Sequence, residues 1–140
     1  INEVAVKVSG DILYLDPPYN QRQYATNYHM LETIAKYDDP EIHGKTGLRE
    51  YQNQKSLYCS RTQVKKAFKD LILKAKAKYI FLSYNNEGLM TLSDIKEIMS
   101  LRGKYGNFTK EYNRFKADKS ENRNYTANKT VEYLHYVVCN

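Results

Sequence analysis

Apolar and polar positions alternate along the chain in blocks that predict strands and helices. Continuous apolar runs occur at Ile12–Leu15 and Tyr79–Ser83, which is typical of strands covered on both faces of a sheet. Between them, apolar side chains recur at helical spacing over residues 24–35 and 64–75. The residues Ser60–Gln63 fit a capping box in front of the second helix.

The rest of the chain predicts a third helix and a hairpin. We expect the helix to run from an N-cap at Ser93 to Leu101, followed by long strands at Tyr105–Phe115 and Thr130–Cys139. A strand, a helix and a strand, followed by a helix and a hairpin, form the second half of an open α/β sheet. The polar segment Asp38–Ser60 is too long for an ordinary connection, so it is either a functional loop or disordered.

Composition narrows the class of protein. A length of 140 residues suits one domain, and the net charge of +6 with fourteen tyrosines fits a nucleic-acid partner, although a solvated lysine-rich surface explains the same charge. Cys59 and Cys139 fit no disulfide or metal-ligand spacing, so we expect a reducing cytosol and no metal. No apolar run approaches the roughly 18 residues that a membrane span needs. Because the sequence opens at Ile1, we expect it to be part of a longer protein.

The tetrapeptide Asp16-Pro17-Pro18-Tyr19 ends the first apolar run and carries the most specific chemistry. Neither proline has an N–H, so the backbone offers only carbonyl acceptors, and the residue before a proline is biased toward an extended conformation. The Asp16 carboxylate and the Pro17 carbonyl can accept both hydrogens of an exocyclic amino group, while Tyr19 stacks on its ring. We therefore expect these four residues to form a catalytic corner. The alternative is an Asp that caps a turn, two prolines that stop a strand and a packed Tyr.

The segment Tyr84–Gly88 follows the second apolar run. Open α/β sheets bind ligands beyond the carboxyl ends of their strands, so this segment is expected to lie beside Asp16. Its polar residues Asn85, Asn86 and Glu87 either line a pocket or form an ordinary turn.

The run Asp11–Asn20 resembles the catalytic motif of Dam-like adenine-N6 DNA methyltransferases. Further matching segments are Tyr28-His29, Gly44–Arg49, Ser83–Gly88 and Val131–Leu134. The resemblance implies an α/β fold: the C-terminal half of a Rossmann-like S-adenosylmethionine-dependent methyltransferase sheet, ending in an antiparallel β-hairpin. In this family a Phe-x-Gly-x-Gly cofactor loop and the target-recognition region precede the Asp-Pro-Pro-Tyr motif. No glycines here are paired as Gly-x-Gly, so residues 1–140 are expected to be the C-terminal part of the catalytic domain.

The resemblance also implies the activity, which is methyl transfer from S-adenosylmethionine to a flipped-out adenine amino group in double-stranded DNA, in a restriction-modification context. Asp16 is then expected to contact the cofactor as well as the base. A cytoplasmic enzyme of bacterial type, with no membrane partner, is the corresponding expectation. Half a sheet also leaves a strand edge exposed, which invites association.

Basic residues suggest where DNA phosphates would bind. Between Ser100 and Thr130 there are eight Lys or Arg against three acids, a local charge of +5 that could clamp a DNA backbone. The expected nucleic-acid-binding residues are Tyr19, Arg22, Lys45, Arg49, Arg114, Lys116, Lys119 and Arg123. Solvated loop charges are the alternative for the cations among them.

Two groups of rival functions remain open. The same corner could serve cytosine-N4 in DNA, an adenine in RNA or a glutamine amide in a protein; related enzymes for those targets often carry Ser or Asn at the first position, so Asp16 favours adenine. A non-catalytic nucleic-acid binder is the rival from another class, and the chain alone is expected to be inactive even if its parent is active.

Overall fold

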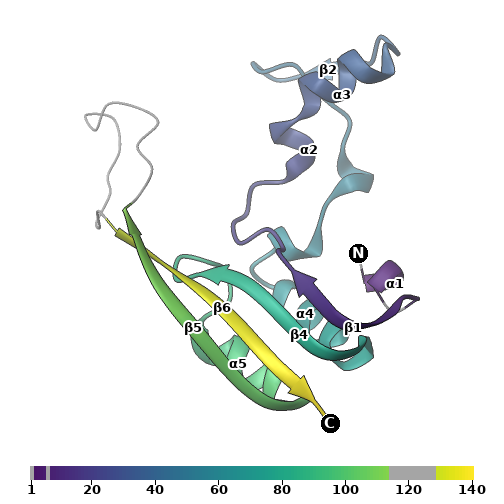
Figure 1. Ribbon diagram of the computed structural model, residues 1–140. Helices are drawn as coiled ribbons and strands as arrows, with labels where there is room; N and C mark the ends of the chain where they lie inside the picture. The colour runs from purple at the N-terminus through teal and green to yellow at the C-terminus, as the bar shows by residue number, and fades with distance from the viewer. Residues whose placement is uncertain (1, 6, 114–128) are drawn as a thin grey trace.

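A four-stranded sheet forms the centre of the structure (Figure 1). The computed structural model describes residues 2–5, 7–113 and 129–140. The strands are β1 (Ser9–Leu15), β4 (Lys76–Asn85), β5 (Gly103–Asn113) and β6 (Lys129–Cys139), in the order β1-β4-β6-β5. β1 pairs with β4 in parallel, whereas β4 with β6 and β6 with β5 are antiparallel. The predicted mixed α/β class and the closing β-hairpin are thereby confirmed.

Two helices, α4 (Val64–Lys74) and α5 (Leu92–Ser100), lie on the same face of this sheet (Figure 1). Their apolar sides pack on alternate residues of β4 and β6. This buried layer includes Phe68, Leu71, Ile72, Ile80, Leu82, Tyr84, Met90, Ile95, Met99 and Val137. Burying each such side chain contributes roughly 1.5–3 kcal/mol, so this layer holds the sheet in shape beneath the strand ends. The short helix α1 (Asn2–Ala5) is tied to α4 by Asn2 Nδ2, which donates to the Ala67 carbonyl at 2.8 Å.

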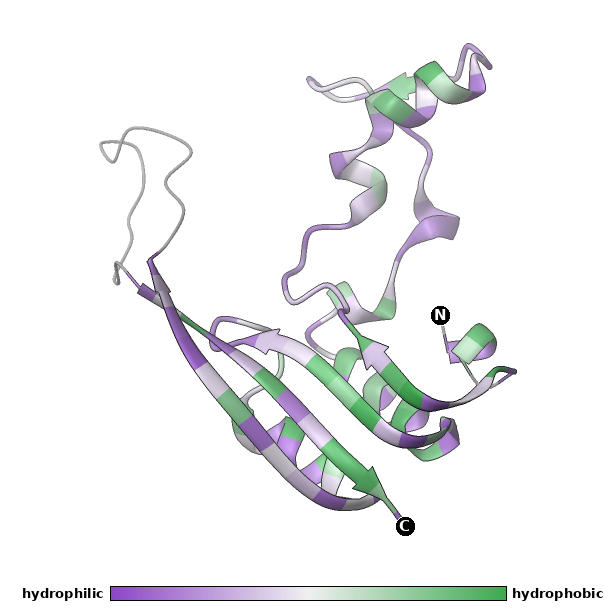
Figure 2. Ribbon diagram, viewed as in Figure 1, coloured by the Kyte–Doolittle hydropathy of each residue, from purple (hydrophilic) through white to green (hydrophobic). Residues whose placement is uncertain are grey.

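The opposite face of the sheet is uncovered in the described residues, so the expectation that both strands are covered on both faces is wrong for this structure. The cause is that α4 and α5 pack on one side only; Ile12 remains 64% exposed and Tyr79 43% exposed. Aromatic rings gather on this outer face, where Tyr136 contacts Phe81 and Phe108 with ring centroids 6.3 and 5.5 Å apart. Figure 2 shows apolar residues along these strands. β1 also has an unpaired outer edge within the described part of the chain.

Residues 20–60 form an arm that projects from the sheet (Figure 1). The helix predicted over residues 24–35 is divided into α2 (Tyr24–Asn27) and α3 (His29–Lys36), because Tyr28 between them leaves helical geometry at φ −114° and ψ 12°. The segment after α3 contains the small hairpin of β2 (Ile42–His43) and β3 (Leu48–Arg49), and the turns η1 (Gln52–Gln54) and η2 (Leu57–Cys59). This segment is therefore an ordered loop rather than a disordered one.

The starts of the two core helices differ from the sequence prediction. α4 begins at Val64, whose N–H bonds to the Ser60 carbonyl at 2.9 Å, and no side-chain cap forms at its start. In α5 the N-cap is Thr91 instead of Ser93: Thr91 Oγ1 accepts from Asp94 N at 3.2 Å, and Asp94 Oδ2 accepts from Thr91 N at 2.9 Å. A Thr that precedes an acid by three residues satisfies two helix N–H groups reciprocally, which Ser93 cannot do here.

His135 is a fully buried polar residue in β6, on the same face as Val137 of the core. Its Nδ1 bonds to the Tyr105 hydroxyl at 2.8 Å, and that hydroxyl accepts from Asn107 Nδ2 at 3.2 Å. The other ring nitrogen, Nε2, has no partner in the described residues. Burial lowers the pKa of His135 to about 4.

This lowered pKa predicts a loss of stability in mild acid. Between about pH 6.5 and pH 4 the unfolded chain binds a proton at His135 that the folded chain does not. The free energy of unfolding therefore decreases as the pH is lowered through this window, by up to about 3 kcal/mol. Urea unfolding at a series of pH values measures the slope. His135→Phe should flatten it, whereas His43→Phe, at an exposed histidine, should leave it unchanged. An equal slope in all three proteins would contradict the assignment.

Candidate active site

The candidate site begins where β1 ends. Leu15 makes the last register pair, with Leu82 of β4, and the prolines that follow cannot extend the ladder because they have no N–H. Pro17 and Pro18 are half-buried, whereas Asp16 is exposed. Among the described residues, the Asp16 carboxylate has no ion-pair partner. The corner therefore presents a carboxylate and proline carbonyls that are open to a ligand.

Tyr19 connects this corner to the end of β4. Its carbonyl accepts a hydrogen bond from Leu89 N at 3.0 Å, and its ring lies edge-on to that of Tyr84, with centroids 6.5 Å apart and planes at 87°. The Tyr19 residue is still 42% exposed, so its ring can take a stacking partner. The prediction that the two strand ends are neighbours is confirmed.

The polar residues after β4 build a turn. Asn85 is buried, and its Oδ1 accepts from Glu87 N at 3.1 Å, while its carbonyl accepts from Gly88 N at 3.3 Å. Asn86 pairs with Val131 at the start of β6: its N–H donates to the Val131 carbonyl and its side-chain Oδ1 accepts from Val131 N, both at 3.0 Å. For Asn85 and Asn86, the turn alternative left open by the sequence therefore describes the structure.

Gly88 lies directly on the ring of Tyr84. A Cβ at position 88 would stand 2.1 Å from Tyr84 Cε1, closer than any real contact. The ring cannot easily move away, because Tyr84 is almost fully buried and its hydroxyl accepts from Met90 N at 3.3 Å. Gly88 is thus required by the aromatic ring that supports Tyr19.

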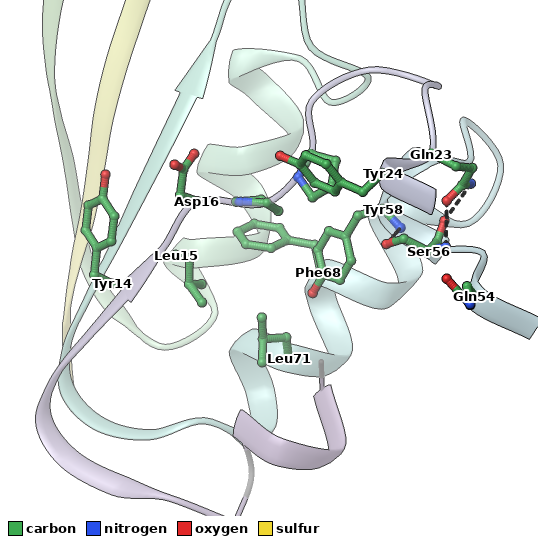
Figure 3. Close-up of a pocket in the computed structure, with 12 residues that line it drawn as sticks. Tyr14, Leu15, Asp16, Gln23, Tyr24, Gln54, Ser56, Tyr58, Phe68 and Leu71 are labelled. Carbon is green, nitrogen blue, oxygen red and sulfur yellow. Dashed lines mark hydrogen bonds between the residues drawn. The ribbon is translucent and has the colours of Figure 1, made fainter. Parts of the chain in front are cut away.

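A pocket of about 360 Å³ opens beside the corner (Figure 3), within the roughly 300–1,000 Å³ of small-molecule sites. Its walls come from the end of β1, from α4 and from the arm. Leu15, Phe68 and Leu71 form an apolar side, and Tyr24 and Tyr58 add aromatic rings. An apolar slot lined by rings suits a flat heterocycle, and the adjacent acceptors of Asp16 and Pro17 suit an amino group. The arrangement can thus hold a planar heterocycle beside a set of hydrogen-bond acceptors.

The three predicted phosphate-binding cations of the arm differ in their exposure to solvent. Arg22 and Lys45 are exposed, whereas Arg49 is only 9% exposed. Arg49 Nη2 pairs with Asp38 Oδ2 at 2.5 Å and Nη1 donates to Thr33 Oγ1 at 3.3 Å. The hydrogen bond from Arg49 lowers the pKa of Asp38. Because its guanidinium fastens β3 to the end of α3, we remove Arg49 from the expected DNA contacts. The other predicted cations, Arg114, Lys116, Lys119 and Arg123, lie outside the described residues.

Several pocket residues escaped the sequence analysis. Phe68 and Leu71 follow the same helical period as the core residues around them, so nothing in the pattern separates a pocket wall from ordinary packing. Gln23 and Ser56 are polar residues in segments without periodicity, and only the fold brings them together. In the arm, Tyr24 is a pocket residue that the sequence did mark, because it fits the helical pattern predicted over residues 24–35.

In the described part of the chain, no three His, Cys, Asp or Glu side chains gather closely enough to hold a metal ion. The described helices are all too short or too polar to cross a membrane. Both cysteines are free, and the buried Cys59 donates its thiol to the Arg22 carbonyl at 3.2 Å.

The amino-acid sequence of this chain matches one known protein family. Residues 1–98 match the family described as D12 class N6 adenine-specific DNA methyltransferase. No solved structure is similar to this chain.

Relatives from several bacteria match this chain by sequence. Type II methyltransferase M.NlaIII from Neisseria lactamica is 58% identical over 134 residues, and type II methyltransferase M.FokI from Planomicrobium okeanokoites is 46% identical over 139 residues. These alignments cover 96% and 97% of this chain but only 40% and 21% of the relatives. Modification methylase StsI from Streptococcus sanguinis is 42% identical over 98 residues, or 70% of this chain and 15% of that protein.

Proposed function

Because the chain belongs to the D12 class N6 adenine-specific DNA methyltransferase family, we propose that it forms the catalytic corner of an enzyme that methylates the amino group of adenine in double-stranded DNA. The observation that carries this proposal is the exposed Asp16 carboxylate, followed by two proline carbonyls and the accessible Tyr19 ring. We also propose that residues 1–140 are the C-terminal part of the catalytic domain, since the relatives are much longer. The parts that bind most of the cofactor and select the DNA sequence then lie elsewhere in the protein.

The corner can activate a poor nucleophile. The lone pair of an adenine amino nitrogen is delocalised into the ring, which makes it unreactive. Asp16 accepts one amino hydrogen and the Pro17 carbonyl accepts the other, so the nitrogen becomes more tetrahedral and its lone pair is freed. Positive charge then develops on the nitrogen, and the same two acceptors stabilise it in the transition state. The surplus proton leaves afterwards to water, so Asp16 need not act as a permanent base.

Tyr19 holds the base outside the duplex. The target amino group is inaccessible in stacked DNA, and extruding the base costs a few kcal/mol. Stacking on an aromatic side chain returns roughly 1–3 kcal/mol per base. The Tyr19 ring is exposed on one side and supported edge-on by Tyr84 on the other, which fits this role.

The residues of the pocket fit part of S-adenosylmethionine. When bound, this cofactor supplies a methyl group on a positively charged sulfur. An apolar slot with the aromatic walls Phe68, Tyr58 and Tyr24 suits the purine of such a molecule, and Asp16 at its edge suits a positive charge. The sequence has no Gly-x-Gly loop, so this chain supplies one wall of the site.

DNA binding completes the proposal. Arg22 and Lys45 are exposed cations on the arm, and the predicted clamp of Arg114, Lys116, Lys119 and Arg123 remains a proposal for residues outside the described part. The names of the relatives, type II methyltransferases and a modification methylase, support a restriction-modification context. Such an enzyme would act in the bacterial cytoplasm, where its DNA lies.

Product analysis tests the proposed function. The full-length protein is incubated with duplex DNA and S-adenosylmethionine labelled in its methyl group, and the digested nucleosides are separated. We expect N6-methyladenine as the only labelled nucleoside. Labelled N4-methylcytosine would assign the corner to another base, and an absence of label in DNA would refute the methyltransferase proposal. The isolated chain is expected to transfer no methyl group.

A further inference from the structure

We propose that Gln23 is a positioning residue, which fastens the outer wall of the pocket beside Asp16 and thereby sets the affinity of the site for the purine of the methyl donor. This inference rests on the proposed function.

The amide of Gln23 satisfies both backbone groups of one residue (Figure 3). Its Oε1 accepts from Ser56 N at 2.8 Å, and its Nε2 donates to the Ser56 carbonyl at 3.4 Å. Ser56 is extended, with φ −84° and ψ 132°, so its N–H and carbonyl are presented as they are in a strand. The Gln23 side chain takes the place of a neighbouring strand, and it needs both a donor and an acceptor to do so.

The contact between Gln23 and Ser56 holds two aromatic residues of the pocket wall, Tyr24 and Tyr58. Gln23 is the N-cap position of α2, which begins with Tyr24, and Ser56 is the N-cap of η2, which carries Tyr58. Ser56 Oγ also accepts from Tyr58 N at 3.3 Å. Tyr24 and Tyr58 both line the pocket, so a bond between positions 23 and 56 sets the distance between their rings. The bond of the Cys59 thiol to the Arg22 carbonyl, at 3.2 Å, supports the same junction.

The junction also joins the catalytic corner to the arm. The chain runs from Tyr19 to Gln23 without a regular element, and Tyr19 itself is fastened to the turn after β4. Without the Gln23 amide, the wall that carries Tyr58 loses two hydrogen bonds to the segment that follows the corner and keeps the bond of the Cys59 thiol to the Arg22 carbonyl. The slot for a planar ring would then widen, while Asp16 and the prolines keep their place at the end of β1.

The first test measures cofactor binding in the full-length protein. Gln23→Ala should raise the dissociation constant for S-adenosylmethionine in calorimetry by about tenfold, the equivalent of losing about one buried hydrogen bond. The dissociation constant for DNA should stay within about twofold of its original value. Gln23→Glu keeps an acceptor for Ser56 N but has no donor for its carbonyl, so a smaller rise is expected. Gln63→Ala removes a glutamine whose side chain makes no cap bond, and it should behave like the original protein.

A double-mutant cycle assigns the effect to the contact itself. Ser56→Pro removes the N–H group that donates a hydrogen bond to Gln23 Oε1. The extended geometry of Ser56 and of Lys55 before it is compatible with proline. Ser56→Ala removes only the hydroxyl and corrects for its loss. If the inference holds, Ser56→Pro and Ser56→Ala differ in their dissociation constants for S-adenosylmethionine when Gln23 is present. This difference disappears when Gln23 is replaced by alanine. Hydrogen exchange of residues 56–59 without ligand should accelerate in Gln23→Ala.

The outcomes separate this inference from the function on which it rests. An unchanged dissociation constant for S-adenosylmethionine in Gln23→Ala, or additive effects in the cycle, would overturn the role of Gln23 and leave adenine methylation untouched. Methylation of another base by the original protein would overturn the proposed acceptor, whereas the measured cofactor affinities would still decide the role of Gln23. Failure of the original protein to bind S-adenosylmethionine would overturn both.

Discussion

Asp16→Ala in the full-length protein is expected to lower the kcat of methyl transfer by at least about 10²–10³-fold, with the dissociation constant for DNA nearly unchanged. The hydrogen bond from the amino group to the carboxylate strengthens as positive charge develops on the nitrogen, so its loss affects the transition state more than the bound state. Single-turnover assays with saturating DNA and cofactor measure the chemical step, and a filter or fluorescence assay measures DNA affinity.

Asp11→Ala is the matched control for this experiment. Asp11 is an exposed aspartate within β1, the strand that ends just before Asp16. Its ion pair with Lys78, at 2.7 Å, lies in solvent and contributes little to stability. This variant should keep its turnover. If Asp16→Ala also kept it, the corner would be structural, and a nucleic-acid binder without catalysis would become the better description. If both variants lost activity equally, the effect would come from β1 as a whole.

Gly88→Ala is expected to destabilise the protein by about 1–3 kcal/mol and to lower kcat as well, because the new methyl group must displace the Tyr84 ring. That ring is buried against the core and supports Tyr19 edge-on, so any shift moves the surface on which the base stacks. Urea unfolding reports the change in stability, and single-turnover kinetics at a permissive temperature report the change in the site.

The control is Gly10→Ala, at a glycine of β1 where the nearest heavy atom to an added Cβ, the Ile12 carbonyl oxygen, is 3.9 Å away. Ordinary van der Waals contact there predicts no loss of stability or of turnover. A Gly88→Ala protein as stable and active as the original would show that the Tyr84 ring has room to move. Stability lost without any loss of turnover would show that Tyr84 does not position Tyr19.

Much of the architecture could be predicted because it depends on local pattern. The apolar runs that became β1 and β4 and the period that became α4 are signals carried within a few residues, and they located the site at the strand ends. The division between α2 and α3 could not be predicted, since Tyr28 fits the helical period and leaves helical geometry only in the fold. The uncovered outer face was missed for a similar reason: an apolar run does not say which other segments will pack on it.

Some candidate site residues were also recognisable from local sequence, whereas others depend on contacts that only the fold creates. Asp16 to Tyr19 form a contiguous motif with its own chemistry, so the sequence was enough to single them out. Arg49 was predicted to contact DNA, with a solvated loop cation as the alternative, and only the approach of Asp38 and Thr33 gave it a buried structural role. The contact of Gln23 with Ser56 joins residues 33 positions apart through a backbone that any residue could provide. No side-chain pattern records such a contact.

The pairing of Asn86 with Val131 has a consequence for engineering this protein. It lengthens the β4–β6 ladder at the end where β6 begins, and the hairpin ladder remains in register as far as Asn113 opposite Lys129. Both boundary residues are therefore held by strand pairing within the described part of the chain. Positions 113 and 129 are therefore natural splice points for transplanting a foreign loop into this scaffold, at the expense of the proposed clamp cations between them.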